Sequence, residues 1–594
     1  MVSALLGAAL VPLAFVTCQS LNFSMSSSLF VAALVLFDTA LTLQFRLILL
    51  DASLTCFIAF TICFWIRFRS RRGEPFSTIW YLDLFLTGVG LGLSVSVKFV
   101  GLSVIAWVGL GTVSDLWELL CDRTVGFLLF ARHFAARAVC LVVVPLVLFL
   151  YFFHIHFSIL DHSGPGNAMM SREFQRTLIG NTVSSGTLID VGLGSTVMLK
   201  HVNSQGGYLH SHKQHYPAGS KRQQITACTF ADDNSLWVIE RDSSALTESS
   251  TMQLLVDGTV VRMVHHTGAY LRADSIDAPV TTGHREVSGQ ANGNTEELDF
   301  KWEVRVLSHR GTVEPESANR VQTFRTLFQL VNLQHHCALS SHDGTKLPNW
   351  GFEQQEITCD PDFSKSLSSG SVWVVDSNSN PLAPADAPSM PPVPMPFWAK
   401  LKELVVTMFA TNQGFTGTHP YQSHASDWPF AVRGVNYWVY PGKAIYFIAN
   451  PLVWWTASGS LFVLAAVAVV IALRSKRGYP DRASPHVQAF EYAGLTLSFA
   501  YALHYVPFFL MKRQLFLHHY LPAAYISMLV AGALFEFFFG RLPRKIRIGV
   551  LLLALAALYW SHRQFLPFVQ GLEMTGEHCQ SLKWRLSWDF DCPR

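Results

Sequence analysis

Residues 137–158, RAVCLVVVPLVLFLYFFHIHFS, form an almost uninterrupted apolar run. A helix needs about 20 apolar residues to cross the hydrocarbon core of a bilayer. Nine further segments approach that length, at about 2–18, 28–44, 47–66, 79–96, 98–118, 447–473, 489–511, 515–539 and 547–567. The sequence therefore predicts a multi-pass α-helical membrane protein.

The composition supports this prediction. Of the 594 residues, 50% are hydrophobic and only 14% are charged, whereas soluble domains carry about 25% charged residues. The net charge is +3, and the basic residues cluster beside apolar runs instead of forming the basic stripe of a nucleic-acid-binding surface. We therefore expect no nucleic acid partner.

Three basic loops predict the orientation of the helices. Short loops rich in Lys and Arg face the cytoplasm. Such clusters follow the third, seventh and ninth apolar segments, and they comprise Arg67, Arg69, Arg71, Arg72, Arg474, Lys476, Arg477, Arg541, Arg544, Lys545 and Arg547. Alternation of ten helices places all three loops on one side and residues 161–440 on the other, lumenal side. It also places Met1 on the lumenal side, which predicts a further helix upstream.

Residues 190–376 have a different character, with short apolar runs separated by turn residues. A pattern recurs three times, with Trp237, Trp302 and Trp373 at matching positions. Three all-β units of this size predict a β-trefoil whose core contains these tryptophans. His210 and His212 share one face of a strand. Metal binding there would need a third ligand, which is not apparent, so a polar turn or a carbohydrate contact is favoured.

The remaining segments complete the predicted organisation. A Pro-rich linker is followed by an amphipathic stretch, 397–408, that is expected at the membrane surface. Cys579 and Cys592 would form a disulfide if that side is oxidising; the sequence leaves this open. The predicted domains are 1–160 (helices), 161–189 (connector), 190–376 (β-trefoil), 377–440 (linker and return segment), 441–568 (helices) and 569–594 (lumenal tail).

Several stretches, together with this order of domains, resemble one family. They are 45–51 (FRLILLD), 98–101 (KFVG), 403–429 (ELVVTMFATNQGFTGTHPYQSHASDWP), 450–455 (NPLVWW), 503–510 (LHYVPFFL) and 516–522 (FLHHYLP). The chain is similar to protein O-mannosyltransferases, in which three MIR repeats lie between two sets of membrane helices.

The resemblance implies a GT-C type fold in the endoplasmic reticulum membrane with the MIR domain in the lumen. It implies transfer of mannose from dolichyl phosphate mannose to Ser or Thr hydroxyls of secretory-pathway proteins, and pairing with a family member as a hetero- or homodimer. The sequence contains no P-loop, dinucleotide fingerprint or zinc-ligand spacing, so we expect no cofactor and no metal.

The resemblance assigns no catalytic residue. The acidic Asp-Glu pair of the family lies in its first lumenal loop, and the sequence aligns only from the second helix of the family onward. Two hypotheses remain: a mannosyltransferase, or a non-catalytic partner of an active one. A transporter or channel is disfavoured because the membrane segments show neither polar pore-lining helices nor internal repeats.

Charged residues near the predicted lumenal ends of helices are candidates for binding the donor phosphate, because charges in membrane helices are costly and a phosphate leaving group needs cations. The charged candidates are Arg46, Lys98 and Arg513, with Lys512 a weaker one. His518, His519 and Tyr520 lie close to Arg513 in the sequence and can donate hydrogen bonds to phosphate oxygens. Asp51 is the nearby carboxylate, either structural, in a pair with Arg46, or a substitute base.

Overall fold

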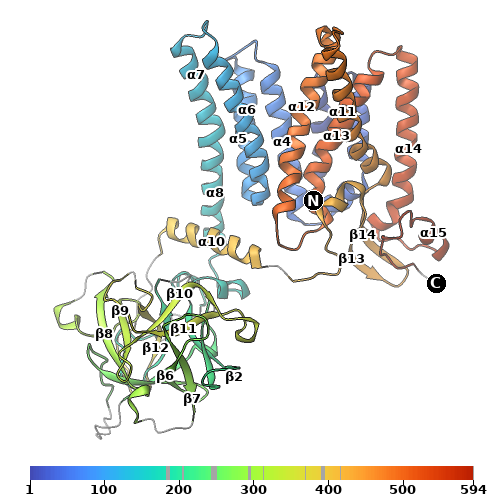
Figure 1. The fold of residues 1–594 in the computed structure, drawn as a ribbon. Helices are drawn as coiled ribbons and strands as arrows, with labels where there is room; N and C mark the ends of the chain where they lie inside the picture. The colour runs from blue at the N-terminus through green and yellow to red at the C-terminus, as the bar shows by residue number, and fades with distance from the viewer. Residues whose placement is uncertain are drawn as a thin grey trace. The chain divides into compact units, whose positions relative to one another are not determined.

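The computed structural model describes residues 1–181, 187–203, 207–229, 231–241, 251–291, 296–311, 314–367, 369–389, 395–414 and 417–592. These residues form two compact units, one made of residues 1–158 with 409–594 and the other of residues 159–408. The first unit is mainly helical and the second is built from β-strands (Figure 1). The β unit is therefore an insertion in the sequence of the helical unit.

The helical unit is a bundle of long helices that run side by side (Figure 1). They are α1 (Val2–Ser20), α2 (Met25–Leu36), α3 (Thr39–Arg46), α4 (Leu50–Ser70), α5 (Thr78–Val97), α6 (Leu102–Cys121), α7 (Phe127–Ala138), α8 (Val144–Ile159), α11 (Pro451–Lys476), α12 (Pro485–Tyr505), α13 (Leu521–Phe539) and α14 (Arg544–Gln570). Within the described part of the chain, nine helical spans are long and apolar enough to cross a membrane, and the bent pair α2–α3 would make a tenth. The chain is a multi-pass membrane protein.

One predicted helix is broken. Residues 28–44 were expected to form a single span, but α2 and α3 meet at an angle of 55°. Asp38 begins α3 by accepting a hydrogen bond from the Leu41 amide at 3.0 Å and another from the Asn450 amide at 3.2 Å. The Asn450 side chain donates to the Phe37 carbonyl at 2.8 Å. These bonds satisfy the backbone groups that the break exposes, which a bilayer would otherwise leave unpaired.

The last N-terminal span is longer than predicted and packs closely. Residues 137–158 were expected to form it, but α7 and α8 are continuous through a π-helical turn, Val139–Val143. A Cβ atom at Gly88 of α5 would lie 1.8 Å from the Cys140 carbonyl oxygen in that turn. Glycine is therefore required for this approach of two helices, as is common at interfaces within membranes.

The described residues of the β unit contain twelve strands in one antiparallel sheet closed on itself. They are β1 (Thr196–His201), β2 (Tyr208–His215), β3 (Gln223–Cys228), β4 (Trp237–Arg241), β5 (Val260–His265), β6 (Tyr270–Asp277), β7 (Arg285–Gln290), β8 (Trp302–His309), β9 (Thr326–Asn332), β10 (Ala338–Lys346), β11 (Gln355–Asp360) and β12 (Trp373–Ser379). Each repeat supplies four strands, and β3, β7 and β11 pair with one another around a pseudo-threefold axis. The predicted β-trefoil is confirmed.

The three tryptophans occupy the core as predicted. Trp237, Trp302 and Trp373 are fully buried at the start of the fourth strand of each repeat. Their indole nitrogens donate to main-chain carbonyls at 2.9, 3.1 and 2.7 Å, and the acceptors are the equivalent residues Leu209, Leu271 and Leu339. Burial therefore leaves none of these polar atoms unpaired.

Two disulfides are present. Cys579 and Cys592, left open by the sequence, are joined with a Cα–Cα distance of 5.5 Å, in the segment that contains α15 (Gly576–Ser581). Cys337 and Cys359 are joined in the third repeat, a pairing that was not predicted. A hairpin of β13 (Val435–Tyr440) and β14 (Lys443–Phe447) packs against the segment held by the first bridge.

Candidate functional site

The two ends of the helical bundle carry different charge arrangements. At the end where α4 finishes, Arg67 and Arg71 contact the buried Asp83 carboxylate at 3.0 and 3.3 Å. Arg69 contacts the buried Asp115 carboxylate at 2.9 Å. These arginines belong to the first of the three basic loops, and their charges are largely neutralised within the fold. The buried carboxylates therefore hold this loop in the fold.

The opposite end brings together three predicted site residues. Asp51 lies in the first turn of α4 and Lys98 directly follows α5. The Lys98 ammonium donates to Asp51 Oδ1 at 3.0 Å, and His518 Nε2 lies 3.9 Å from Asp51 Oδ2. All three side chains are partly exposed. His518 Nδ1 is buried and has no hydrogen-bond partner among the described residues.

Arg513 adds a second permanent cation to this cluster. Its guanidinium donates to Asn412 Oδ1 at 2.6 Å, from the last turn of α10 (Phe397–Gly414), and to the Gln514 carbonyl at 3.3 Å. Lys98 and Arg513 both act electrostatically on His518. We call Asp51, Lys98, Arg513 and His518 the cation cluster. Sequence reasoning missed Asn412, because a single amide in a polar stretch carries no spacing signal.

Arg46 has a different partner from the predicted one. The alternative of an Arg46–Asp51 ion pair is wrong: Arg46 donates to the Val569 carbonyl near the end of α14, and Asp51 pairs with Lys98. The α3 helix ends at Arg46 and so directs this side chain toward α14. Arg46 also lines a groove of about 240 Å³ between α1, α2 and α3, whose lining is otherwise apolar apart from Thr42.

His519 and Tyr520 serve the packing of the cluster instead of facing the site. The Phe516 amide donates to His519 Nδ1 at 3.0 Å, which closes the turn before α13. Tyr520 is 1% exposed, and its hydroxyl lies 2.9 Å from the Tyr501 hydroxyl. The prediction that both side chains bind the donor phosphate is therefore not supported by their placement, since α13 begins here and turns them into the bundle.

Comparisons with known proteins agree with this architecture. Residues 1–161 match the profile of dolichyl-phosphate-mannose-protein mannosyltransferase, residues 207–367 match the MIR domain, and residues 397–588 match the C-terminal four TMM region of protein-O-mannosyltransferase. Dolichyl-phosphate-mannose–protein mannosyltransferase 1 of Candida albicans is 34% identical over 99% of this chain and 68% of the relative. Protein O-mannosyl-transferase 2 of Danio rerio is 31% identical over 99% of this chain and 79% of the relative.

The chain belongs to the protein O-mannosyltransferase family. A solved structure, the protein O-mannosyltransferase Pmt1–Pmt2 complex of Saccharomyces cerevisiae bound to the sugar donor, superposes with a TM-score of 0.82 at 33% identity, covering 99% of this chain and 80% of that chain. The membrane helices therefore have the GT-C fold. Asp51 and Lys98 lie in the first matched segment and Arg513 and His518 in the third. The cation cluster thus joins the two membrane segments that define the O-mannosyltransferase family.

In the MIR domain of this O-mannosyltransferase, the predicted ligand contact His210 is buried and His212 is half-buried. His210 is 1% exposed, and its Nδ1 lies 3.2 Å from the Ser235 hydroxyl. Its Nε2 lies 3.1 Å from His212 Nε2. Burial lowers the pKa of His210 to about 4, so the ring is neutral at neutral pH. The placement of His210 therefore does not support its predicted role as a carbohydrate contact, because both ring nitrogens are already engaged inside the repeat.

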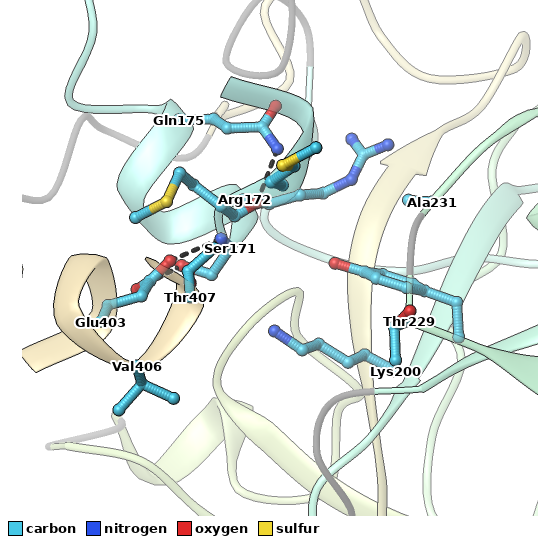
Figure 2. Close-up of a pocket in the computed structure, with 12 residues that line it drawn as sticks. Ser171, Arg172, Gln175, Lys200, Thr229, Ala231, Glu403, Val406 and Thr407 are labelled. Carbon is cyan, nitrogen blue, oxygen red and sulfur yellow. Dashed lines mark hydrogen bonds between the residues drawn. The ribbon is translucent and has the colours of Figure 1, made fainter. Parts of the chain in front are cut away.

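The same unit contains a polar cavity of about 280 Å³ that the sequence did not reveal (Figure 2). Arg172 and Lys200 line it, and Ser171 donates to the Glu403 carboxylate through its amide and its hydroxyl, at 2.5 and 2.8 Å. Beside it, burial raises the pKa of Asp376, although nearby Lys200 and Arg172 oppose the shift. Its lining comes from separate segments, which is why no motif marks it.

Proposed function

We propose that this chain transfers mannose from dolichyl phosphate mannose to Ser or Thr hydroxyls of proteins in the secretory pathway. The observation that carries the proposal is the cation cluster, which is assembled from both membrane segments that match the family. The cluster lies at the bundle end away from the neutralised arginines.

The reaction explains why the cluster needs an excess of positive charge. When mannose moves to the acceptor, the bond from its C1 atom to the phosphate oxygen breaks and a bond from C1 to the hydroxyl oxygen forms. The hydroxyl proton is released to solvent or to the departing dolichyl phosphate. Negative charge therefore develops on the leaving phosphate. Positioned cations stabilise such charge in a site shielded from water, and the partly exposed side chains of Lys98, Arg513 and His518 are placed for this.

Asp51 suits a positioning role better than a role as base. Its Oδ1 accepts a hydrogen bond from Lys98 at 3.0 Å, so this oxygen is already occupied by a donor. By holding the Lys98 ammonium at the end of α5, Asp51 fixes one side of the phosphate site. The groove beside Arg46 is apolar enough for the isoprenoid chain of the donor.

We also propose that the chain resides in the endoplasmic reticulum membrane, with the MIR domain and the cation cluster in the lumen. The basic loops support this orientation, and two disulfides suit an oxidising compartment. The similar yeast structure is a Pmt1–Pmt2 complex, so the proposed assembly is a dimer with a family member. Acceptor proteins and the lipid-linked donor are the ligands, and no further cofactor is proposed.

The proposal is tested by mannosyl transfer in microsomes from cells that lack the endogenous family. The assay uses radiolabelled dolichyl phosphate mannose and a Ser/Thr-rich acceptor peptide. Arg513→Ala is compared with Lys512→Ala, which removes a cation from the exposed neighbouring residue. We expect transfer by the unmodified chain, a loss of roughly 100-fold or more for Arg513→Ala, and little change for Lys512→Ala.

The assay includes co-expression with a full-length family member, because the similar solved structure is a complex. Absence of transfer by the chain alone and with the partner would overturn the proposal. Equal losses in the Arg513 and Lys512 variants would instead show that the cation cluster has no special role in the reaction.

A further inference from the structure

The three repeats of the β unit have equivalent corners, where one repeat meets the next. The strand registers align Arg222, His284 and Gln354, each directly before the third strand of its repeat. The same registers align His212, Asp274 and His342 on the second strands, and Cys228, Gln290 and Asp360 at the ends of the third strands. Each corner combines a residue from one repeat with two from the next.

At two of these corners, side chains pair directly across the repeat boundary. At the first, Arg222 forms an ion pair with Asp274 of the next repeat. At another, Gln354 Nε2 lies 3.4 Å from His212 Nε2, and Gln354 Oε1 accepts from the Thr226 hydroxyl at 2.6 Å. In both corners the polar side chains find a charge or hydrogen-bond partner across the repeat boundary.

The remaining corner contains two imidazoles and a carboxylate. One ligand-capable atom from each of His284, His342 and Asp360 lies within 4.8 Å of the others. His284 Nε2 is 3.5 Å from Asp360 Oδ1, and the two rings are 5.5 Å apart between centroids. The His342 ring makes no hydrogen bond to any described residue. This corner differs from the other two because two imidazoles and a carboxylate converge on one point.

From this contrast we propose that the His284–His342–Asp360 corner binds a divalent transition-metal ion, with Zn²⁺ the best match. Zinc takes His nitrogen and carboxylate oxygen at about 2.0–2.1 Å in tetrahedral geometry, which places neighbouring ligand atoms about 3.3 Å apart. The 3.5 Å separation of His284 Nε2 and Asp360 Oδ1 fits that edge. Mg²⁺ and Ca²⁺ are disfavoured because they prefer oxygen ligands.

The surroundings of the site support a bound metal. His284 Nδ1 lies 2.9 Å from the Thr358 hydroxyl, which orients the ring and leaves Nε2 for the ion, the usual arrangement around ligating histidines. The Asp362 amide donates to Asp360 Oδ1 at 2.9 Å, which orients the carboxylate. Asp360 is buried and both histidines are half-buried. The ion would join the second repeat to the third.

The test uses the full chain purified in detergent and treated with EDTA. ZnSO₄ binding is followed by competition with a chromogenic chelator, and CoCl₂ binding by its visible absorption. We expect one ion per chain and a higher melting temperature with zinc. His342→Ala should abolish binding, and Thr358→Val should weaken it roughly 10- to 100-fold. His212→Ala, at the equivalent corner, is the matched control and should bind zinc as the unmodified chain does.

A double variant keeps the test decisive if single variants misfold. His284→Arg with His342→Asp reproduces the ion pair of the first corner, so the domain should fold without zinc and bind none. The proposal is overturned if the unmodified chain binds no zinc, or if the double variant binds zinc as well as the unmodified chain. It is also overturned if His212→Ala abolishes binding while His342→Ala does not.

Discussion

Each end of the helical bundle carries a cluster of charged residues, and the two clusters differ in charge balance. At one end four arginines face four carboxylates, the residues being Arg67, Arg69, Arg71, Arg72, Glu74, Asp83, Asp115 and Glu118. In the cation cluster at the other end, Lys98 pairs with Asp51, whereas Arg513 donates to the neutral Asn412 side chain. Charges beside a bilayer are costly unless they are paired or used. The balanced cluster therefore serves folding, and the cation cluster is available for an anionic ligand.

The largest expected effect is the loss of mannosyl transfer when one cation of the cation cluster is removed. Lys98→Met removes a cation that would stabilise the leaving phosphate, so we expect transfer to fall roughly 100- to 1,000-fold. The melting temperature in detergent should change little, because Lys98 is partly exposed. Transfer is measured with saturating acceptor peptide and normalised to the amount of folded chain. A matching loss of stability would mean that the two ends do not differ in the way proposed.

The second effect concerns the stability that the balanced cluster provides. Asp83→Ala removes the buried carboxylate between Arg67 and Arg71, and breaking a buried ion pair costs roughly 3 to 5 kcal/mol. We expect a lower melting temperature and unchanged transfer per folded molecule. Glu74→Ala is the control, since its side chain is 72% exposed and should contribute little. A selective loss of transfer in Asp83→Ala would contradict the proposal, because it would place the reaction at the end where α4 finishes and not at the cation cluster.

The MIR domain differs from both charged clusters of the helical bundle, because it buries titratable histidines in their neutral form. Burial lowers the pKa of His210 and of His265 to about 4, from the ordinary value of 6.5. Between those values the unfolded chain binds more protons than the folded chain, so stability is full above about pH 6.5 and falls as the pH drops toward 4. For each histidine the loss is at most about 3 kcal/mol.

Thermal unfolding between pH 7 and pH 5, followed by fluorescence, measures this dependence. His210→Gln should flatten the curve, whereas His215→Gln, at an exposed position of β2, should leave it unchanged. Identical curves for the two variants would show that the acid sensitivity has another source.

The smallest effect concerns an exposed ion pair of the balanced cluster. Arg72 and Glu118 approach to 3.5 Å, but their side chains are 46% and 62% exposed. An exposed pair of this kind is worth about 0.5 kcal/mol, so Glu118→Ala should barely shift the melting temperature. A shift as large as that of Asp83→Ala would show that charge count, and not burial, governs stability at this end.

Part of the site could be predicted from the sequence. A lysine or carboxylate at the end of an apolar run is costly wherever the chain folds, so Lys98 and Asp51 stood out without a structure. The partner of each charge could not be predicted, because Asp51 meets Lys98 through the packing of α4 on α5 and not through sequence spacing. For the same reason the sequence suggested the wrong partner for Arg46 and a ligand-binding role for Tyr520.

The sequence by itself determined the membrane helices, the threefold β repeat and the tryptophan core, because lipid and the domain interior both select for side-chain hydrophobicity at regular spacing. Only the tertiary structure decided the α2–α3 bend, the neutralisation of the arginines and the character of the three trefoil corners. Each of these depends on polar groups that lie far apart in the chain and meet at hydrogen-bond distance. Such contacts are short-ranged and directional, so spacing along the sequence does not encode them.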